Sequence, residues 1–352
     1  LKYIFEKLHH NCYILCSSGN EFEFIKLESS TTAPSLKPYL EQKLNKTIKG
    51  QKRKSLLKTI RKKQWRVMQC IVKEFSNGSF ATEFQEFLNS LNGKIPSGIF
   101  VFSLTDAQIL REDGKEPWQM ITGSKDLGLY KFNKHLPLLA YSGQQGYWDI
   151  PIPTQDDIDY VKNPQDIPTI EWSQKIQKAV FRGNPTGCGY TTETNMRLKI
   201  STLNSPLLDA GIIQNKSSSL KFDPIEGLGE LNQAQIKKVP KLDLINEQIK
   251  FKYIVHIDGN VLAYRLLKSM LLGSLILRVR SPYIHWLDHI MEEGKHFIYV
   301  KEDLSDLEQR IEWCIQNDSK AKKIAQQGQR FAQKVLTKDF INKYFLKLLK
   351  SL

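Results

Sequence analysis

Two stretches of the chain combine an apolar run, a glycine-containing turn and a helical pattern. Residues 253–257 form a short β-branched and aromatic run, which is typical of a strand that a parallel sheet buries on both faces. Gly259 follows, and residues 261–272 continue with helical periodicity. The pattern predicts a strand, a turn and a helix start, where unpaired backbone N–H groups attract anions.

The second stretch predicts a junction of the same kind. Residues 178–182 have the pattern of a strand, and the loop after them contains three glycines. A helix is expected to follow, with Thr191 or Thr192 as its N-cap. The loop lacks the Lys-Ser/Thr ending of a P-loop and the spacing of a dinucleotide fingerprint. Neither an ATPase nor a dehydrogenase is therefore favoured.

Two arginines accompany these junctions. Arg182 ends the strand 178–182, and Arg265 lies one turn into the helix predicted after Gly259. Ligands of open α/β sheets bind at the carboxyl ends of the strands, and a planar guanidinium group suits a diphosphate. The arginines therefore predict one anionic ligand between them. The alternative is that both turns and both arginines serve packing and the surface alone.

The remaining pattern predicts an α/β protein with two domains. At 352 residues the chain is longer than one hydrophobic core usually grows. Apolar runs predict further strands at residues 99–104, 136–141, 274–279 and 296–300. A helix is expected to start at Glu302, Asp303 or Ser305, and two lysine-rich helices follow from Asp318. We expect domains over residues 1–165 and 166–330, and a C-terminal helix over 331–352. A stripe is expected to pack back on the first domain through Phe331, Val335, Phe340, Tyr344 and Leu348.

Composition is that of a soluble globular protein, with 41% hydrophobic and 25% charged residues. No run approaches the roughly 20 apolar residues that span a bilayer, and the first residues are not a secretory signal. Five scattered cysteines do not make a disulfide framework and favour a reducing compartment. A cytoplasmic location is the expectation from this chain, although a start at Leu1 is compatible with a segment of a longer protein.

The net charge of +14 is concentrated in one segment. Residues 43–66, from Lys43 to Arg66, contain eleven Lys and Arg residues and no acid. Such a segment is compatible with an anionic membrane, a polyanion or a nucleic acid, and equally with a solvated helix that buries Leu56, Leu57 and Ile60. Trp65 is the one aromatic residue nearby, so a nucleic acid is the less expected partner.

Four motifs occur in a fixed order: residues 149–154 (DIPIPT), 181–187 (FRGNPTG), 258–265 (DGNVLAYR) and 300–307 (VKEDLSDL). Together they resemble glycosyltransferase family 90, which includes protein O-glucosyltransferases, O-xylosyltransferases and capsule-associated glycosyltransferases. The resemblance spans roughly residues 95–330, and an ordered set of motifs is more specific than any single one. Residues 1–90 match the pattern poorly.

The resemblance implies a GT-B architecture, in which two Rossmann-like domains face a central cleft. It implies an inverting transfer of a sugar, glucose or xylose, from a UDP-sugar to a hydroxyl of a protein or glycan. The first domain would take the acceptor and the second would hold the donor. By motif, the UDP-sugar would be held by Arg182, Gly183, Asn184, Gly187, Asp258, Gly259, Asn260, Val261, Leu262, Ala263, Tyr264 and Arg265. Leu262 stands where many relatives have alanine.

The catalytic base is less well defined. An inverting transfer needs a carboxylate that takes the proton of the acceptor hydroxyl, on the side opposite the diphosphate. The apolar strand from Gly98 places Asp106 at its carboxyl end, and Asp106 is the predicted base. Glu74, Glu112 and Asp113 are the alternatives, although residues 111–114 have the pattern of a simple polar turn. Asp106 is also compatible with a purely structural role, as the cap of the next turn.

The segment around residues 148–153 is predicted to form an acceptor-side wall. Pro151 and Pro153 impose an extended, rigid chain, and Trp148 is suited to stack on a sugar or peptide beside Asp149. A domain crossover with a buried tryptophan is the alternative. Asp157 and Asp159 resemble the Asp-x-Asp metal motif, but their place at a probable helix start favours a role in the helix. We therefore expect no metal and no cofactor beyond the UDP-sugar substrate.

Overall fold

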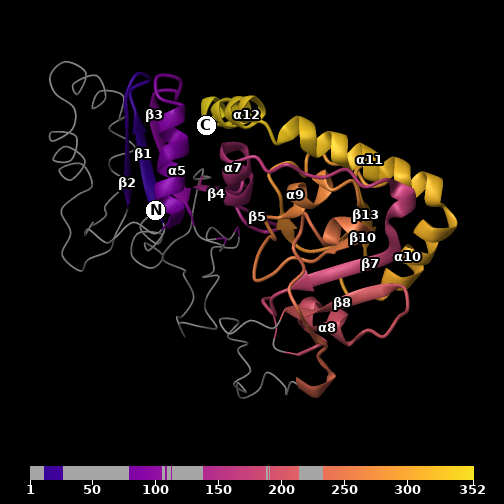
Figure 1. Cartoon of the computed structure of the whole chain (residues 1–352). Helices are drawn as coiled ribbons and strands as arrows, with labels where there is room; N and C mark the ends of the chain where they lie inside the picture. The colour runs from indigo at the N-terminus through magenta and orange to yellow at the C-terminus, as the bar shows by residue number, and fades with distance from the viewer. Residues whose placement is uncertain are drawn as a thin grey trace. The chain divides into compact units, whose positions relative to one another are not determined.

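A computed structural model describes residues 12–26, 79–104, 108, 112, 138–187, 189, 191–213 and 233–352. The chain divides into two compact units. The first contains residues 1–159, 284–286 and 338–352, and the second contains residues 160–283 and 287–337. Figure 1 labels their helices and strands.

The first unit is built on a five-stranded sheet of order β2-β1-β3-β4-β6. Strand β1 is antiparallel to β2 and β3, and β3, β4 and β6 are parallel. The expected strands at 99–104 and 136–141 correspond to β3 and β4. The elements are β1 (Cys12–Ser17), β2 (Phe22–Lys26), α5 (Ser79–Ser90), β3 (Gly98–Ser103), β4 (Leu138–Ala140), β5 (Gly143–Gln144), β6 (Asp149–Pro151), α7 (Gln155–Lys162, which ends in the second unit) and α12 (Lys338–Ser351).

Aromatic packing joins α12 to the core of the first unit. Phe345 is fully buried, and its ring centroid lies 6.0 Å from that of Phe84, 5.1 Å from that of Phe87 and 6.2 Å from that of Phe102. The buried stripe of α12 is therefore Ile341, Phe345 and Leu349, one position after the predicted Phe340, Tyr344 and Leu348. The other two predicted members, Phe331 and Val335, belong to α11 in the second unit. The predicted Phe340 and Tyr344 contact Trp286 instead, so α12 presents two apolar faces within this unit.

The second unit contains a six-stranded parallel sheet of order β13-β11-β10-β7-β8-β9 (Figure 1). From β7 the chain runs to β8 and β9 on one side, and from β10 it runs to β11 and β13 on the other. The boundary between β7 and β10 is thus a topological switch point, and α/β proteins bind ligands at the carboxyl ends of strands at such points. Its elements are β7 (Ile176–Gly183), α8 (Met196–Thr202), β8 (Leu208–Ile213), β9 (Lys238–Val239), β10 (Phe251–His256), α9 (Leu266–Leu271), β11 (Leu275–Val279), β12 (Tyr283–Ile284, which ends in the first unit), β13 (Ile298–Val300), α10 (Leu307–Gln316) and α11 (Asp318–Val335).

Both strand predictions next to the glycine turns are confirmed as β7 and β10, but the helix starts differ from those predicted. Helix α9 begins at Leu266 rather than near residue 261, because the carboxylate of Asp258 accepts the Ala263 N–H and holds the chain as a loop. Helix α8 is capped by Asn195 rather than by a threonine. The Asn195 side chain accepts the N–H groups of Arg197 and Leu198.

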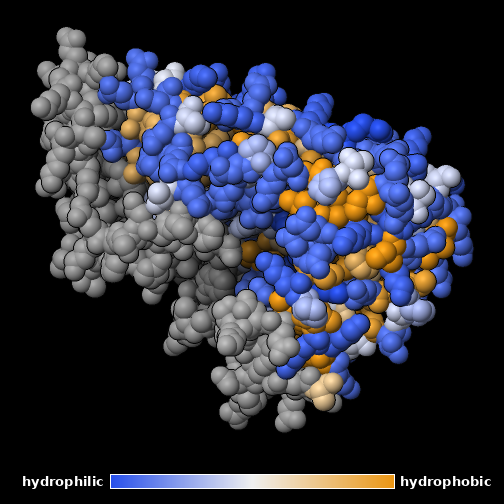
Figure 2. All heavy atoms as spheres, viewed as in Figure 1, coloured by the Kyte–Doolittle hydropathy of each residue, from blue (hydrophilic) through white to orange (hydrophobic). Residues whose placement is uncertain are grey.

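Helix α11 packs closely on the second unit because its inner face is made of small residues. Ala321, Ala325 and Ala332 are buried, and a Cβ added to Gly328 would lie 2.5 Å from the carbonyl oxygen of His296. Its outer face is hydrophilic, as Figure 2 shows along the helix. No helix in the described part of the chain has the length and apolar character needed to cross a membrane.

Candidate functional site

Three loops leave the carboxyl ends of neighbouring strands in the second unit. The first edge loop (residues 184–195) follows β7, the second edge loop (257–265) follows β10, and the third edge loop (280–283) follows β11. The first two flank the topological switch point. Both predicted junctions therefore meet at one edge of the sheet.

Arg197 joins the first two loops. Its Nη1 donates to the Thr186 hydroxyl (2.6 Å) and to the Asn184 carbonyl (3.4 Å). Its Nη2 donates to the Ile257 carbonyl (2.9 Å), and its Nε donates to the carbonyl oxygens of Ile257 (3.2 Å) and Asp258 (3.0 Å). Because residue 197 belongs to no recognised motif, sequence analysis missed it.

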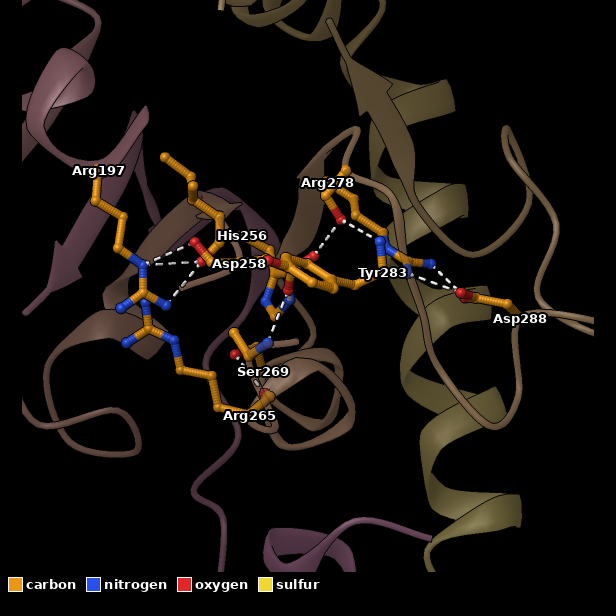
Figure 3. Close-up of polar contacts among 11 residues, drawn as sticks. Arg197, His256, Asp258, Arg265, Ser269, Arg278, Tyr283 and Asp288 are labelled. Carbon is orange, nitrogen blue, oxygen red and sulfur yellow. Dashed lines mark hydrogen bonds and ion pairs between the residues drawn. The ribbon is translucent and has the colours of Figure 1, made fainter. Parts of the chain in front are cut away.

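Asp258 organises the second loop from within (Figure 3). Its Oδ1 accepts the Ala263 N–H (2.7 Å) and lies 3.5 Å from His256 Nε2, and its Oδ2 accepts the Ser281 hydroxyl (2.5 Å). Burial acts to raise the pKa of Asp258, but His256 and the hydrogen bonds from Ser281 and Ala263 outweigh it and lower the pKa to about 2. The ionised carboxylate therefore stabilises the loop.

Asn260 links all three loops. Its Oδ1 accepts the Gly187 N–H of the first loop (2.9 Å), and its backbone carbonyl accepts the Tyr283 hydroxyl of the third (2.7 Å). Gly187 has a φ of +156°, and a Cβ there would lie 2.7 to 2.9 Å from side-chain atoms of Asn195. Glycine is therefore needed at residue 187, so that the loop can approach the start of α8.

Arg265 and Arg197 bring two positive charges to this edge. Figure 3 shows the guanidinium group of Arg265 extended toward that of Arg197, and Arg265 also lies over the Phe181 ring at 5.9 Å. Burial and, to a smaller extent, the charge of Arg265 lower the pKa of Arg197 to about 9, although Asp258 acts to raise it. Two like charges held together favour the binding of an anion between or beside them.

Arg182 occupies a different environment. Its Nη2 contacts both carboxylate oxygens of Asp209 (2.9 and 2.8 Å), and its Nη1 donates to the Asp209 carbonyl (2.8 Å). Alternation along β7 directs Arg182 to the face of the sheet opposite Phe181, whose ring lies near Arg265. Arg197, and not Arg182, is thus the arginine beside Arg265. The predicted contact of Arg182 with a diphosphate stays a prediction.

The other predicted donor-site residues line the same loops. Gly183 ends β7, and Asn184 is exposed in the first loop. In the second loop, the side chains of Val261, Leu262 and Ala263 are buried. Tyr264, next to Arg265 in the chain, is half-buried. The backbone of these residues, rather than their side chains, is therefore what the loop presents to a ligand.

Several predicted residues lie outside the described part of the chain. These are the candidate bases Glu74, Asp106 and Asp113, and the basic segment Lys43 to Arg66. On the acceptor side, Asp149 and Pro151 belong to β6, Pro153 is buried and Trp148 is half-buried, all within the first unit. The acceptor-binding role of these four residues stays a prediction.

Asp157 and Asp159 have structural partners. Thr154 and Asp157 form a capping box at the start of α7, in which Thr154 N–H donates to Asp157 Oδ2 (3.2 Å) and Asp157 N–H donates to Thr154 Oγ1 (3.3 Å). Asp159 accepts a hydrogen bond from the Gln155 amide (3.0 Å). Within the described ranges, no group of three or more His, Cys, Asp or Glu side chains is arranged to hold a metal ion.

Asp157 is also the centre of a buried polar cluster in the first unit. Its Oδ2 accepts the Thr154 hydroxyl (2.7 Å) and the Trp286 indole N–H (2.8 Å), and His285 Nε2 lies 3.9 Å away. Its Oδ1 has no hydrogen-bond partner among the described residues. Burial raises the pKa of Asp157 to about 7, although the hydrogen bonds from Thr154 and Trp286 act to lower it.

Comparison with known proteins decides the family. The family model described as Glycosyl transferase family 90 matches residues 36–352. This chain belongs to glycosyl transferase family 90. The resemblance that its four motifs carry is thereby confirmed, and the match reaches further toward the N-terminus than the motifs do.

Relatives of this family 90 chain include animal and viral proteins. Protein O-glucosyltransferase 3 of Homo sapiens is 31% identical over 225 residues, which are 61% of this chain and 41% of that protein. Uncharacterized protein 035R of Invertebrate iridescent virus 3 is 33% identical over 266 residues, which are 69% of this chain and 24% of that protein. The chain thus spans well under half the length of these relatives. A solved structure of Anabaena Alr3699/HepE in complex with UDP-glucose matches 49% of each chain with a TM-score of 0.34 and 16% identity, so the structural likeness is weak.

Proposed function

We propose that the chain is a UDP-sugar-dependent, inverting glycosyltransferase of GT-B type, and that the three edge loops bind the donor. The paired guanidinium groups of Arg197 and Arg265 at the switch point are the observation that carries this proposal. A UDP-sugar presents two adjacent anionic phosphates, which match two adjacent cations. Gly187 and Gly259 let these loops pack closely, since a Cβ at Gly187 would meet Asn195 and one at Gly259 would meet Thr186 and Arg197.

In the proposed reaction, an acceptor hydroxyl attacks the anomeric carbon of the sugar. Its oxygen forms the new glycosidic bond as the bond between that carbon and the diphosphate oxygen breaks, which inverts the configuration. The hydroxyl proton passes to a carboxylate, for which we propose Asp106, with Glu74 and Asp113 as alternatives. UDP departs with the bonding electrons, and Arg265 stabilises the charge that develops on it.

The donor and acceptor are proposed from the relatives. Proteins named protein O-glucosyltransferase support glucose as the donor sugar and a protein hydroxyl as the acceptor. Xylose remains the second donor and a glycan hydroxyl the second acceptor. We propose that transfer needs no metal, because fixed guanidinium groups can neutralise the leaving diphosphate.

Calorimetric titration with UDP tests the donor site. Arg265→Ala is expected to weaken UDP binding by roughly 1.5 to 3 kcal/mol, the scale of a charge-assisted hydrogen bond. Arg330→Ala, an exposed arginine on α11, is the matched control and is expected to bind UDP as the wild type does. Wild-type affinity in Arg265→Ala would overturn the assignment of the site.

A salt series tests the alternative of a polyanion binder that uses Lys43 to Arg66. Binding through many phosphate contacts weakens steeply with ionic strength, whereas UDP held by a few fixed groups responds less. A thermal-shift comparison of UDP-glucose, UDP-xylose, UDP-galactose and UDP-N-acetylglucosamine then identifies the donor. A ligand at 100 times its dissociation constant stabilises the folded protein by about 2.7 kcal/mol.

A further inference from the structure

A pocket of about 260 Å³ lies in the second unit, at the C-terminal end of α9. Three segments line it: the end of α7 with the chain after it (residues 160–167), the turn before β10 (243–246), and α9 through Lys268 and Leu271. The last two segments lead into the amino ends of β10 and β11, whereas the edge loops leave the carboxyl ends of the strands. None of these lining residues belongs to an edge loop, so the pocket is separate from the proposed donor site.

Hydrogen bonds fix the turn that forms one wall of the pocket. The carboxylate of Asp243 accepts the backbone N–H groups of Ile245 (3.0 Å) and Asn246 (2.8 Å), and it also accepts the Asn246 side-chain amide (3.0 Å). The Asp243 N–H donates to the Glu247 carboxylate (2.6 Å). The turn is therefore shaped by its own side chains, and such preorganisation reduces the entropy that is lost when a ligand binds.

Lys175 joins this turn to the wall that α9 forms. The residue is 5% exposed, and its Nζ donates to the carbonyl oxygens of Ile249 (2.5 Å) and Leu272 (3.0 Å). Nζ also donates to the Ser274 hydroxyl (3.0 Å). Ile249 follows the turn, and Leu272 follows Leu271 of the pocket lining. One buried ammonium group therefore holds two of the three walls together.

The charges of the lining disfavour strongly charged ligands. Asp166 and Asp243 contribute two carboxylates, and Lys268 contributes one ammonium group. Burial, and then the charge of Asp166, raise the pKa of Tyr160, so the Tyr160 hydroxyl keeps its proton at neutral pH. Two carboxylates repel an anion, and the ammonium group repels a cation. A neutral ligand therefore suits these residues best.

The hydrogen-bonding groups of the lining match those of a sugar. The amides of Gln165 and Asn246 and the hydroxyl of Tyr160 can both donate and accept, as sugar hydroxyl groups do. The Asp166 carboxylate has two oxygens that can accept from neighbouring hydroxyl groups. An apolar surface suited to the C–H face of a sugar ring comes from Ile167, Leu244, Ile245 and Leu271. Pockets for drug-sized ligands begin at roughly 300 Å³, so this slightly smaller pocket suits a single ring.

We propose that this pocket is a second carbohydrate site, which binds one neutral sugar residue near the amino ends of β10 and β11. The site goes beyond the proposed donor site and does not depend on it. A sugar ring has about a dozen non-hydrogen atoms, and small ligands gain limited affinity per atom. The dissociation constant is therefore expected to be on the order of 1 to 10 mM.

Saturation-transfer NMR with methyl glucoside and the full 352-residue chain tests this site. Asp166 is exposed, so Asp166→Ala spares the core, and it is expected to weaken binding of the glucoside about 10-fold or more. Tyr160→Phe removes one hydroxyl group and is expected to weaken binding about 3- to 10-fold. Glu312→Ala removes a negative charge from the exposed face of α10 in the same unit, and as the matched control it is expected to bind as the wild type does. Arg265→Ala is expected to keep the affinity for the glucoside while it loses affinity for UDP.

The outcomes separate this site from the donor site. No binding at about 50 mM glucoside, several times the expected dissociation constant, overturns the inference. Wild-type affinity in both Asp166→Ala and Tyr160→Phe, or loss of glucoside binding in Arg265→Ala, also overturns it, because the sugar then binds elsewhere. Tighter binding of serine or inorganic phosphate than of the glucoside contradicts a neutral ligand. Maltotriose that binds as well as the glucoside supports the site as a receptor for one unit of a glycan chain, and exclusion of maltotriose supports it as a receptor for a free monosaccharide. A chain that binds the glucoside but not UDP retains this site and overturns the donor site alone.

Discussion

The substitution Asp157→Asn is expected to change the pH dependence of stability of this family 90 chain. Asp157 is fully buried, and burial raises its pKa from 3.8 to about 7. In the unfolded chain the carboxyl group has its ordinary pKa and loses its proton near pH 4. Between about pH 4 and pH 7 the folded protein therefore holds a proton that the unfolded chain has released.

This difference fixes the sign of the effect. The folded pKa is raised, so the contribution of Asp157 to stability is fully present below about pH 4 and is lost as the pH rises through about 7. One pKa unit corresponds to about 1.4 kcal/mol, so a shift of about three units is worth on the order of 4 kcal/mol. Above that window the ionised carboxylate is buried with one oxygen lacking a partner among the described residues.

Urea unfolding at a series of pH values measures this contribution. Asparagine does not titrate, and its amide oxygen still accepts hydrogen bonds from Thr154 and Trp286. The difference in free energy of unfolding between wild type and Asp157→Asn should fall by up to about 4 kcal/mol from pH 4 to pH 8, because the other titrating groups cancel. Asp156→Asn, on the same helix turn, controls for the change in net charge. Parallel curves for the wild type and Asp157→Asn would refute the reasoning.

Three further outcomes are expected. Phe345→Ala should destabilise the protein by about 3 to 5 kcal/mol in urea unfolding, because it empties the centre of an aromatic cluster, and a loss below about 1 kcal/mol would contradict that packing. Transfer, followed as UDP release, should persist in excess EDTA, and activity that is lost and then restored by manganese would contradict metal independence. Asp106→Asn should leave UDP affinity unchanged and lower turnover by roughly two to four orders of magnitude, whereas normal turnover would move the search for the base to Glu74 and Asp113.

Periodicity located four of the six strands in the sheet of the second unit, and predicted neither β8 nor β9. Strands β7, β10, β11 and β13 match predicted runs, because strands buried on both faces are marked by β-branched and aromatic residues. Helix starts were predicted less well. The side chains of Asp258 and Asn195 accept hydrogen bonds from backbone N–H groups a few residues later, and these bonds decide where α9 and α8 begin. Such contacts leave no mark in the hydrophobic pattern of the sequence.

The sequence by itself determined the family and the two glycine junctions, because four motifs in a fixed order and glycine-rich turns are local features of the chain. The sequence did not determine which arginine side chains lie beside one another at the edge of the sheet. Strand alternation and the Asp209 carboxylate turned Arg182 to one face of the sheet, while helix α8 brought Arg197 to the other beside Arg265. Only the tertiary structure decided this, since the partners of each guanidinium group come from strands and helices that are distant along the chain.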